Sequence, residues 1–380
     1  MGRSLSSPDG SCNSDIVVIG AGLAGATAAS KLGHNFRITL VDPRSTYPAV
    51  FKAEKFEPGQ AESLRRLGLL DTLVPRARRI REVRSYYGNK FFKITPTEQY
   101  GISYGDMVNT LRTALPAQVT CKLGRVVKIS NSPELQVVTL DSGEQLTCRL
   151  VVLACGLNGD LLHGLQMKRI WIQRAQSAAL GFSLAPTNGR SFPFDAVTYS
   201  LMTPRTGIDY ISLFPMDQVL RANLFAFPSA GSLWMHRLLR DPDRELPRLL
   251  PKLSHAIGGY RLVGKMEASL INLYRTEGDP PDGIVLIGDA AQNSCPSTGS
   301  GLTKIFTDVE ILAEMMPHWF ETAGMSKEKL HSFVTDPRKV AADTAAIRTA
   351  YYRKHACSER SLKWKVHRLR LHLTRQLKNV

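Results

Sequence analysis

The sequence has 380 residues, of which 43% are hydrophobic, and it carries a formal net charge of +16. This length supports a sizeable core divided between two lobes, and the composition is that of a globular protein. No apolar run reaches the roughly 18 to 20 residues that a membrane-spanning helix needs. No His, Cys or carboxylate cluster has the spacing of metal ligands, so we expect no metal site. The six cysteines are scattered, which favours reduced thiols and a cytoplasmic location.

The positive charge is concentrated in two stretches. Residues 76–84 contain five arginines and one glutamate, and residues 351–380 contain nine Lys or Arg against one Glu. Such charge favours an anionic partner, either a lipid surface or an acidic carrier protein, or it forms a solvated basic face without a partner. The basic residues are not interleaved with base-stacking aromatics, so we expect no nucleic-acid partner.

After a polar leader at residues 1–14, which we expect to be disordered, the stretch from Asp15 to Asp42 predicts a dinucleotide-binding unit. A β-branched strand (16–19) is followed by a glycine-rich turn, a helix (26–31) and a second strand (37–41). In the turn, Gly20 permits the tight bend, Gly22 lets a pyrophosphate approach, and Gly25 lets the helix sit close to the strand. Asp42 stands where a ribose hydroxyl needs an acceptor.

The next elements are shorter. We expect a helix at 62–69, a hairpin at 83–95 with Gly88-Asn89 at its turn, and a helix at 104–115. Short strands follow at 119–130, 135–140 and 145–147, and an apolar strand at 150–154 ends at Cys155-Gly156.

From about residue 170 the pattern changes to longer strands at 192–202, 208–215, 219–227 and 268–276, with helical stretches between 232 and 253. This pattern is typical of an antiparallel sheet with helices on one side, inserted into the first lobe.

The first lobe returns with an apolar strand that runs directly into Gly288-Asp289. A loop containing Pro296, Gly299 and Gly301 follows, and then a helix from about Leu302. Asp289 can accept hydrogen bonds from a polyol chain, and the positive end of the helix can stabilise the negative charge of a reduced flavin. The alternative is a strand–loop–helix connection that is merely tight. Because the glycine-rich turn precedes it, we favour flavin.

Three stretches carry a resemblance to a known family: GAGLAG with Asp42, FEPGQAESLRRLGL at 56–69, and GDAAQNSCPSTGSGL at 288–302. Over roughly residues 15–317 the chain resembles the single-component (class A) flavoprotein monooxygenases of the para-hydroxybenzoate hydroxylase type. We therefore expect an α/β fold: a Rossmann-like FAD-binding lobe with an inserted α+β substrate domain, built on an antiparallel sheet, and a C-terminal helical region. The FAD lobe would comprise 15–82, 100–169 and 278–335, with a joining hairpin at 83–99, a substrate domain at 170–277 and a basic helical region at 336–380.

The resemblance implies FAD as cofactor, and NAD(P)H and O2 as co-substrates. The substrate would be a hydrophobic, aromatic or polyketide-like small molecule, hydroxylated or epoxidised in specialised metabolism. The turn residues Gly20, Gly22, Leu23, Ala24 and Gly25 would bind the FAD diphosphate, Asp42 the adenosine ribose, and Asp289 the ribityl or diphosphate-proximal hydroxyls. Lys52 stands near a family arginine that contacts the cofactor, and the isoalloxazine would be lined by Pro296, Gly299, Gly301 and Leu302.

The chain also departs from the family pattern. Cys155 stands where a middle motif has aspartate, Gln292 replaces a histidine after the GDAA motif, and Thr303 replaces an asparagine. These changes bear on nicotinamide handling and reduction more than on FAD binding. For Cys155 we favour a small packed thiol over a reactive one.

The inserted lobe supplies candidate substrate contacts but no nameable catalytic residue. Tyr210, Ser212 and Phe214 alternate on one strand, and Arg221, Asn223, Phe225 and Phe227 on the next. We expect an aromatic-walled pocket in which Tyr210 or Arg221 makes a polar contact.

The C-terminal stretch from Leu362 predicts a basic amphipathic helix, with leucines and a valine on one face. We favour packing of this face on the protein body. An anionic membrane surface, which would make the protein peripheral to the membrane, and an acidic carrier protein are the alternatives.

Other functions share these motifs. A flavin-dependent halogenase would normally show Trp-x-Trp-x-Ile-Pro, which this sequence lacks. A flavin-dependent reductase or oxidase, and a non-catalytic binding protein that uses the FAD fold for recognition, stay open.

Overall fold

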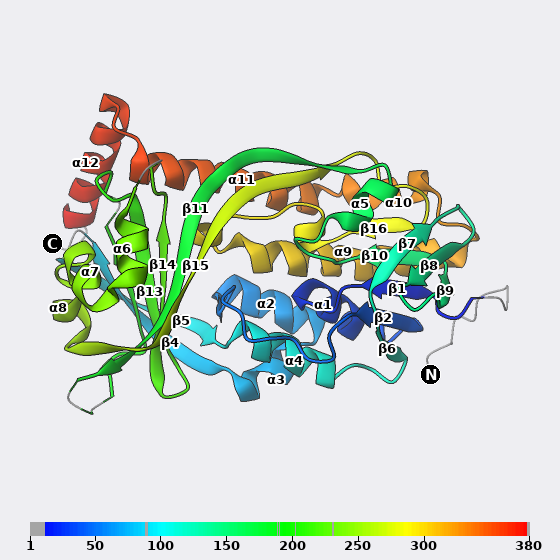
Figure 1. The fold of residues 1–380 in the computed structure, drawn as a ribbon, viewed down its shortest axis with the longest axis horizontal. Coiled ribbons are helices and arrows are strands. Elements are labelled where there is room, and N and C mark those ends of the chain that lie inside the picture. Colours follow the sequence, from blue (N-terminus) through cyan, green and yellow to red (C-terminus); the bar gives the residue numbers. More distant parts are fainter. Residues whose placement is uncertain are drawn as a thin grey trace.

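The structure is a computed structural model that describes residues 12–87, 90–187, 189, 191–201, 203–229 and 232–377. Most of the predicted leader and the predicted Gly88-Asn89 turn lie outside these ranges. Figure 1 shows two lobes placed along the long axis, with a pair of long strands running from one to the other.

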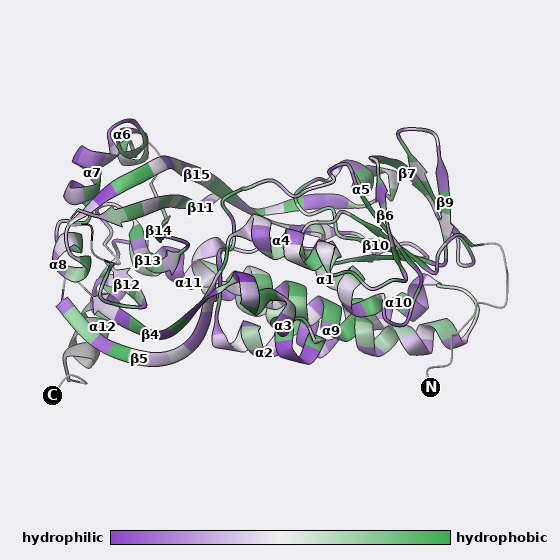
Figure 2. Cartoon of the chain, turned by 90° about the horizontal axis from the view of Figure 1, so that it is seen from below, coloured by the Kyte–Doolittle hydropathy of each residue, from purple (hydrophilic) through white to green (hydrophobic). Residues whose placement is uncertain are grey.

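The first lobe is built on a parallel five-stranded sheet in the order β16-β10-β1-β2-β6. Its strands are β1 (Ile16–Ile19), β2 (Ile38–Asp42), β6 (Val119–Leu123), β10 (Leu150–Leu153) and β16 (Ile284–Leu286). Four of them are buried along their whole length, which explains their continuous apolar sequences. Figure 2 shows these strands in green between the surrounding elements.

Alternate residues of the parallel sheet enter two different cores. Ile16 and Val18 face a core shared with α1 (Leu23–Leu32), α4 (Tyr104–Thr113) and α9 (Ser300–Glu321). Val17 and Ile19 face a core shared with a three-stranded sheet on the other side. That small sheet consists of β7 (Val126–Ser130), β8 (Gln136–Leu140) and β9 (Gln145–Cys148).

The second lobe is built on an eight-stranded sheet in the order β15-β11-β14-β13-β12-β4-β5-β3. Neighbouring strands are antiparallel except β12 and β4, which are parallel. The strands are β3 (Lys55–Phe56), β4 (Arg78–Tyr87), β5 (Lys90–Gly101), β11 (Lys168–Pro186), β12 (Ala196–Ser200), β13 (Ile208–Met216), β14 (Val219–Ala226) and β15 (Tyr260–Glu277). Three helices share a core with this sheet: α6 (Trp234–Arg240), α7 (Pro242–Leu249) and α8 (Leu253–Ile257). The predicted fold class is confirmed.

The longest strand, β11, has no counterpart among the predicted strands. Its central segment, residues 176–182, is buried at every position and contains no β-branched residue. Neither alternation nor strand-typical composition therefore marks it.

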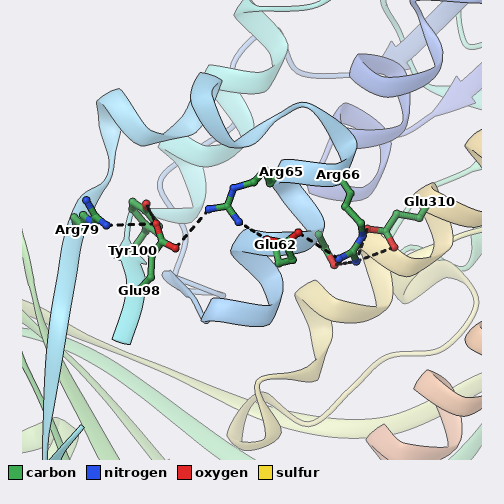
Figure 3. Close-up of polar contacts among 8 residues, drawn as sticks. Glu62, Arg65, Arg66, Arg79, Glu98, Tyr100 and Glu310 are labelled. Atoms are coloured by element: carbon green, nitrogen blue, oxygen red, sulfur yellow. Dashed lines mark hydrogen bonds and ion pairs between the residues drawn. The ribbon is translucent and has the colours of Figure 1, made fainter. Parts of the chain in front are cut away.

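The hairpin β4–β5 is joined to the helices of the first lobe by ion pairs at the surface (Figure 3). Glu98 of β5 lies 3.6 Å from Arg79 of β4 and 3.5 Å from Arg65 of α2 (Pro58–Leu67). Arg66 of the same helix pairs with Glu310 of α9 at 2.9 Å. Part of the basic stretch at 76–84 is thus neutralised within the chain. Such exposed pairs contribute little stability individually.

Shorter helices fill the first lobe, namely α3 (Leu70–Leu73), α5 (Asp160–Gly164) and α10 (Lys327–Val334), with 3₁₀ turns at Val74–Arg76, Gly288–Ala290 and Pro296–Thr298.

The helix α11 (Pro337–Ser358) connects the two lobes. Near its start, Lys339 pairs with Asp308 of α9 at 2.7 Å, and near its end, Arg353 pairs with Asp209 of β13 at 2.6 Å. The carboxylates of Asp308 and Asp209 are both buried. Through these two ion pairs, α11 fixes the lobes to one another.

The last helix, α12 (Leu362–Leu377), packs on α11 with its aromatic face. Trp364 and His367 contact the ring of Tyr352. The predicted packing of the apolar face is wrong for its described members: Leu362 is 76% exposed, Val366 41% and Leu369 57%. Trp364 and His367, rather than these apolar residues, make the contacts with α11. Among the described residues no helix is long and apolar enough to cross a membrane.

Candidate functional site

The glycine-rich turn between β1 and α1 has the geometry of a phosphate cradle. Gly20 has a φ of +98°, and a Cβ at Gly25 would lie 1.8 Å from the carbonyl oxygen of Gly20. A Cβ at Gly22 would meet only the ring of Tyr47, at 3.7 Å. The backbone conformation and the close packing of the turn therefore require glycine at positions 20 and 25. Gly22, in contrast, keeps open space in front of the N-terminus of α1. This open backbone fits a dinucleotide diphosphate.

Asp42, at the end of β2, holds the same turn. Its Oδ2 accepts from the Ala21 amide at 2.9 Å, and its Oδ1 accepts from the Arg44 amide at 2.9 Å. Of the other predicted turn residues, Leu23 is buried and Ala24 is half-buried. Leu23 would therefore serve such a site through its backbone.

A cavity of about 540 Å³ lies between the two lobes. The first lobe supplies six of the predicted cofactor residues to its wall, together with Gln60 and others: Lys52, Asp289, Pro296, Gly299, Gly301 and Leu302. The second lobe supplies an aromatic wall, to which Trp171, Tyr210, Phe214, Phe225 and Tyr274 belong. The structure thus brings the loop predicted to line a flavin against the strands predicted to contact substrate.

The loop before α9 presents a helix N-terminus to the cavity. Gly299 adopts a left-handed conformation with a φ of +67° and precedes the first residue of α9. Gln60 donates to the Gly299 carbonyl at 2.7 Å and to Thr303 Oγ1 at 3.1 Å. The N-terminus of this 22-residue helix places positive potential at the cavity wall.

Asp289 is the most informative acidic group at this wall. No described residue donates a hydrogen bond to its carboxylate, although the side chain lines the cavity. Burial raises the pKa of Asp289, against the opposing effect of Lys52, Lys304 and Arg169. Asp289 is half-buried and faces the cavity without a donor from the described residues, so its position fits a group that binds a polyol ligand.

A buried charge cluster supports the strand end behind Asp289, and sequence reasoning did not identify it. Asp308 accepts from the Gly288 amide at 2.8 Å and from Lys339 at 2.7 Å. Lys304 donates to the Gln292 carbonyl at 2.8 Å and pairs with Asp343 at 2.7 Å. The available signal was Lys304 and Asp308 at i and i+4, next to the apolar residues Ile305, Phe306 and Val309.

Cys155 is a neutral thiol in this environment. Its Sγ donates to the Asn158 carbonyl at 2.9 Å, and burial raises its pKa to about 11 although Arg169 acts in the opposite direction. Arg169 also donates to the Gly156 carbonyl at 2.9 Å and stacks on Tyr274 at 4.4 Å. Arg169, which the sequence did not single out, therefore orders the loop that follows Cys155.

The two predicted substrate contacts lie in different surroundings. Tyr210 lines the cavity, and its hydroxyl donates to the Ser297 carbonyl at 3.1 Å. Arg221 does not line the cavity; it pairs with Glu54 at 2.8 Å and with Glu267 at 3.0 Å. Its buried partner Glu54 does line the cavity.

Two sequence families match separate parts of the chain. The family described as lycopene cyclase protein matches residues 15–202, and squalene epoxidase matches residues 246–370. The squalene epoxidase erg1 of Aspergillus fumigatus is 23% identical over 385 aligned residues, which cover 92% of this chain and 77% of that protein.

Solved structures match over most of the chain. The p-nitrophenol 4-monooxygenase PnpA of Pseudomonas putida DLL-E4 has a TM-score of 0.71 at 18% identity, and the match covers 93% of this chain and 91% of the PnpA chain. PqsL of Pseudomonas aeruginosa, a probable FAD-dependent monooxygenase, has a TM-score of 0.70 at 19% identity, and the match covers 91% of this chain and 97% of the PqsL chain. The flavin-dependent brominase Bmp2 has a TM-score of 0.67 at 16% identity, and the match covers 94% of this chain and 92% of the Bmp2 chain.

At these identities the structural likeness establishes the fold, and the relatives support the predicted oxidoreductase class. The resemblance found in the sequence is confirmed, and the chain has the fold of the class A FAD-dependent monooxygenases.

Proposed function

We propose that the protein is an FAD-dependent monooxygenase that uses NAD(P)H and O2 to hydroxylate or epoxidise a hydrophobic, aromatic or polyketide-like small molecule in specialised metabolism. The observation that carries the proposal is that Asp289 and the N-terminus of α9 share one cavity with an aromatic wall. FAD, when bound, supplies the redox and oxygen chemistry that side chains lack.

The chain's own residues would bind, orient and exclude water. Gly22 and the start of α1 would hold the diphosphate, and Asp42 the adenosine ribose. Asp289 would accept hydrogen bonds from the ribityl chain, and Gly299 and Gly301 would lie against the isoalloxazine. The aromatic wall would keep water from the reacting atoms.

A hydrophobic substrate is supported by the apolar side chains that line the cavity and are also exposed. Leu157 is 56% exposed, Trp171 43% and Leu270 61%. Exposed apolar side chains next to a cavity are typical of an entrance for apolar ligands.

Alternative functions of the same fold remain distinguishable. The similarity to a brominase favours a halogenase, but the sequence lacks the Trp-x-Trp-x-Ile-Pro stretch. Cys155, in place of the family aspartate, favours a flavin-dependent reductase or oxidase that takes electrons from another source. A non-catalytic binding protein would retain no flavin.

The deciding experiment is anaerobic mixing of the purified, flavin-loaded protein with NADPH and then NADH. We expect loss of the oxidised-flavin absorbance, and its return when oxygen is readmitted. Flavin that stays oxidised with both nucleotides would contradict the use of NAD(P)H and favour a partner reductase. Protein that takes up no FAD would contradict the enzyme itself.

For partners and location we propose a cytoplasmic protein that meets an anionic surface through α12, where Lys363 and Lys365 are exposed beside the apolar face. An acidic carrier protein and an anionic membrane both fit this charge.

A further inference from the structure

A second carboxylate, more deeply buried than Asp289, presents a free acceptor to the cavity. Glu54 immediately precedes β3, is 4% exposed and lines the cavity. Arg221 Nε donates to its Oε2 at 2.8 Å, and the Asn223 amide, oriented as a donor, lies 3.0 Å from the same oxygen. Its other oxygen, Oε1, accepts no hydrogen bond from any described residue.

Burial raises the pKa of Glu54, whereas the hydrogen bonds from Arg221 and Asn223 and the charge of Arg221 oppose that rise and support the ionised carboxylate. Two donors converge on Oε2, and the guanidinium of Arg221 is fixed on its far side by Glu267, 3.0 Å away. An ionised carboxylate is an acceptor only. Because no donor of the chain occupies Oε1, this oxygen is available to a ligand that carries a donor. A ligand anion placed against Oε1, in contrast, would meet the negative charge of Glu54.

We propose that Glu54 is the specificity-determining residue of the substrate site, and that its Oε1 accepts a hydrogen bond from a hydroxyl or N–H group of the substrate. The substrate class is then a neutral, apolar molecule that carries one hydrogen-bond donor, and carboxylate-bearing aromatics are disfavoured. The surrounding wall fits this class, because Phe214 and Phe225 line the same cavity and Phe51 stacks on Arg221 at 5.3 Å. This inference rests on the proposed function, since it assigns the substrate of the same cavity.

Three probes of equal ring size test the proposal: 2-naphthol, 2-methoxynaphthalene and 2-naphthoate. Each is titrated by calorimetry into the flavin-loaded protein near neutral pH. The wild type should bind 2-naphthol at least about tenfold more tightly than either of the others, because only 2-naphthol can donate to Oε1.

The test variant is Glu54→Gln, and the matched control is Glu267→Gln. In Glu54→Gln the amide oxygen stays with Arg221 and Asn223, so the amide NH2 turns to the cavity and the preference for 2-naphthol should be lost. Glu267 pairs with the same arginine, Arg221, but does not line the cavity. The Glu267→Gln variant should therefore keep the preference for 2-naphthol.

A wild type that binds the three probes equally would overturn the proposal, even if Glu54→Gln fails to fold. A Glu54→Gln variant with unchanged probe affinities and reduced FAD content would also overturn it, since Glu54 would then serve the cofactor. Flavin that NAD(P)H never reduces would count against the proposed monooxygenase but not against this probe series.

Discussion

Gly22 and Gly25 lie three residues apart in the same turn, but a methyl group added to each would have different effects. Gly25→Ala forces a carbon to within 1.8 Å of a carbonyl oxygen, and we expect loss of folded protein. Gly22→Ala meets no atom closer than 3.7 Å, so the variant should fold with a near-wild-type thermal midpoint while FAD affinity falls at least about tenfold. Thermal unfolding measures the stability of each variant, and flavin content after gel filtration measures its retention of FAD. A Gly22→Ala protein with full flavin would contradict the diphosphate assignment.

Asp289→Ala should weaken FAD retention far more than it destabilises the apoprotein, because the carboxylate has no donor among the described residues. Asp289→Asn gives the pH test. Burial raises the folded-state pKa of Asp289, so the unfolded chain releases its proton first as pH rises. The wild-type apoprotein should therefore lose stability relative to Asp289→Asn from about pH 4 upward. Full flavin content in Asp289→Ala would exclude Asp289 from the cofactor site.

Cys155 should react slowly with alkylating reagents. Its pKa is raised to about 11, so at pH 8 its thiolate fraction is roughly 100-fold below that of an ordinary thiol. The exposed Cys121 provides the internal comparison. Mass spectrometry after timed iodoacetamide treatment should show Cys121 modified first, and Cys155 accelerating with pH up to about 11. Preferential labelling of Cys155 at neutral pH would indicate a reactive thiolate instead.

Among the elements, the contact between α9 and α11 depends on buried charge. Lys339 is 5% exposed and Asp308 1%, so Lys339→Met leaves a buried carboxylate unpaired. We expect a loss of about 3–5 kcal/mol in the free energy of unfolding, measured by urea denaturation. The double variant Asp308→Asn/Lys339→Met should recover part of that loss. If the two variants are equally destabilised, packing rather than charge decides this contact.

For the molecule as a whole, α11 connects the two lobes, whereas α12 packs on α11. Truncation after Glu359 removes the ring contacts to Tyr352 and the exposed apolar face, but leaves the bridge from Lys339 to Arg353 intact. The truncated protein should keep its flavin content and thermal midpoint and lose binding to vesicles containing phosphatidylserine. Equal vesicle binding by both forms would place the anionic-surface site elsewhere; binding by neither would leave an acidic protein as the candidate partner.

The sequence could predict the parts of the fold whose residues carry strong local signals. The turn at Gly20 to Gly25 and the loop after Asp289 are such parts, because glycine and a strand-end carboxylate have few other uses in those positions. The strand β11 escaped prediction because its buried segment is made of small residues without alternation. Glu54 escaped because its significance depends on Arg221, which is 167 positions away in the chain and adjacent only after the sheet has formed.

The pairing of β11 with β15 has a mechanical consequence. The two strands are 19 and 18 residues long, but their register shifts between Trp171 and Ser177, where Ala175 has a φ of +44°. Such a bulge interrupts the ladder of hydrogen bonds locally, and a further register shift lies between Gly181 and Ser183. Asn272 occupies this point: its Oδ1 accepts from the Ala175 amide at 2.7 Å, and its carbonyl accepts from Asn293 of the loop after Asp289 at 2.5 Å. Movement of the ribbon at this point would therefore be transmitted through Asn272 to the loop after Asp289, while the ion pairs of α11 hold the two lobes together.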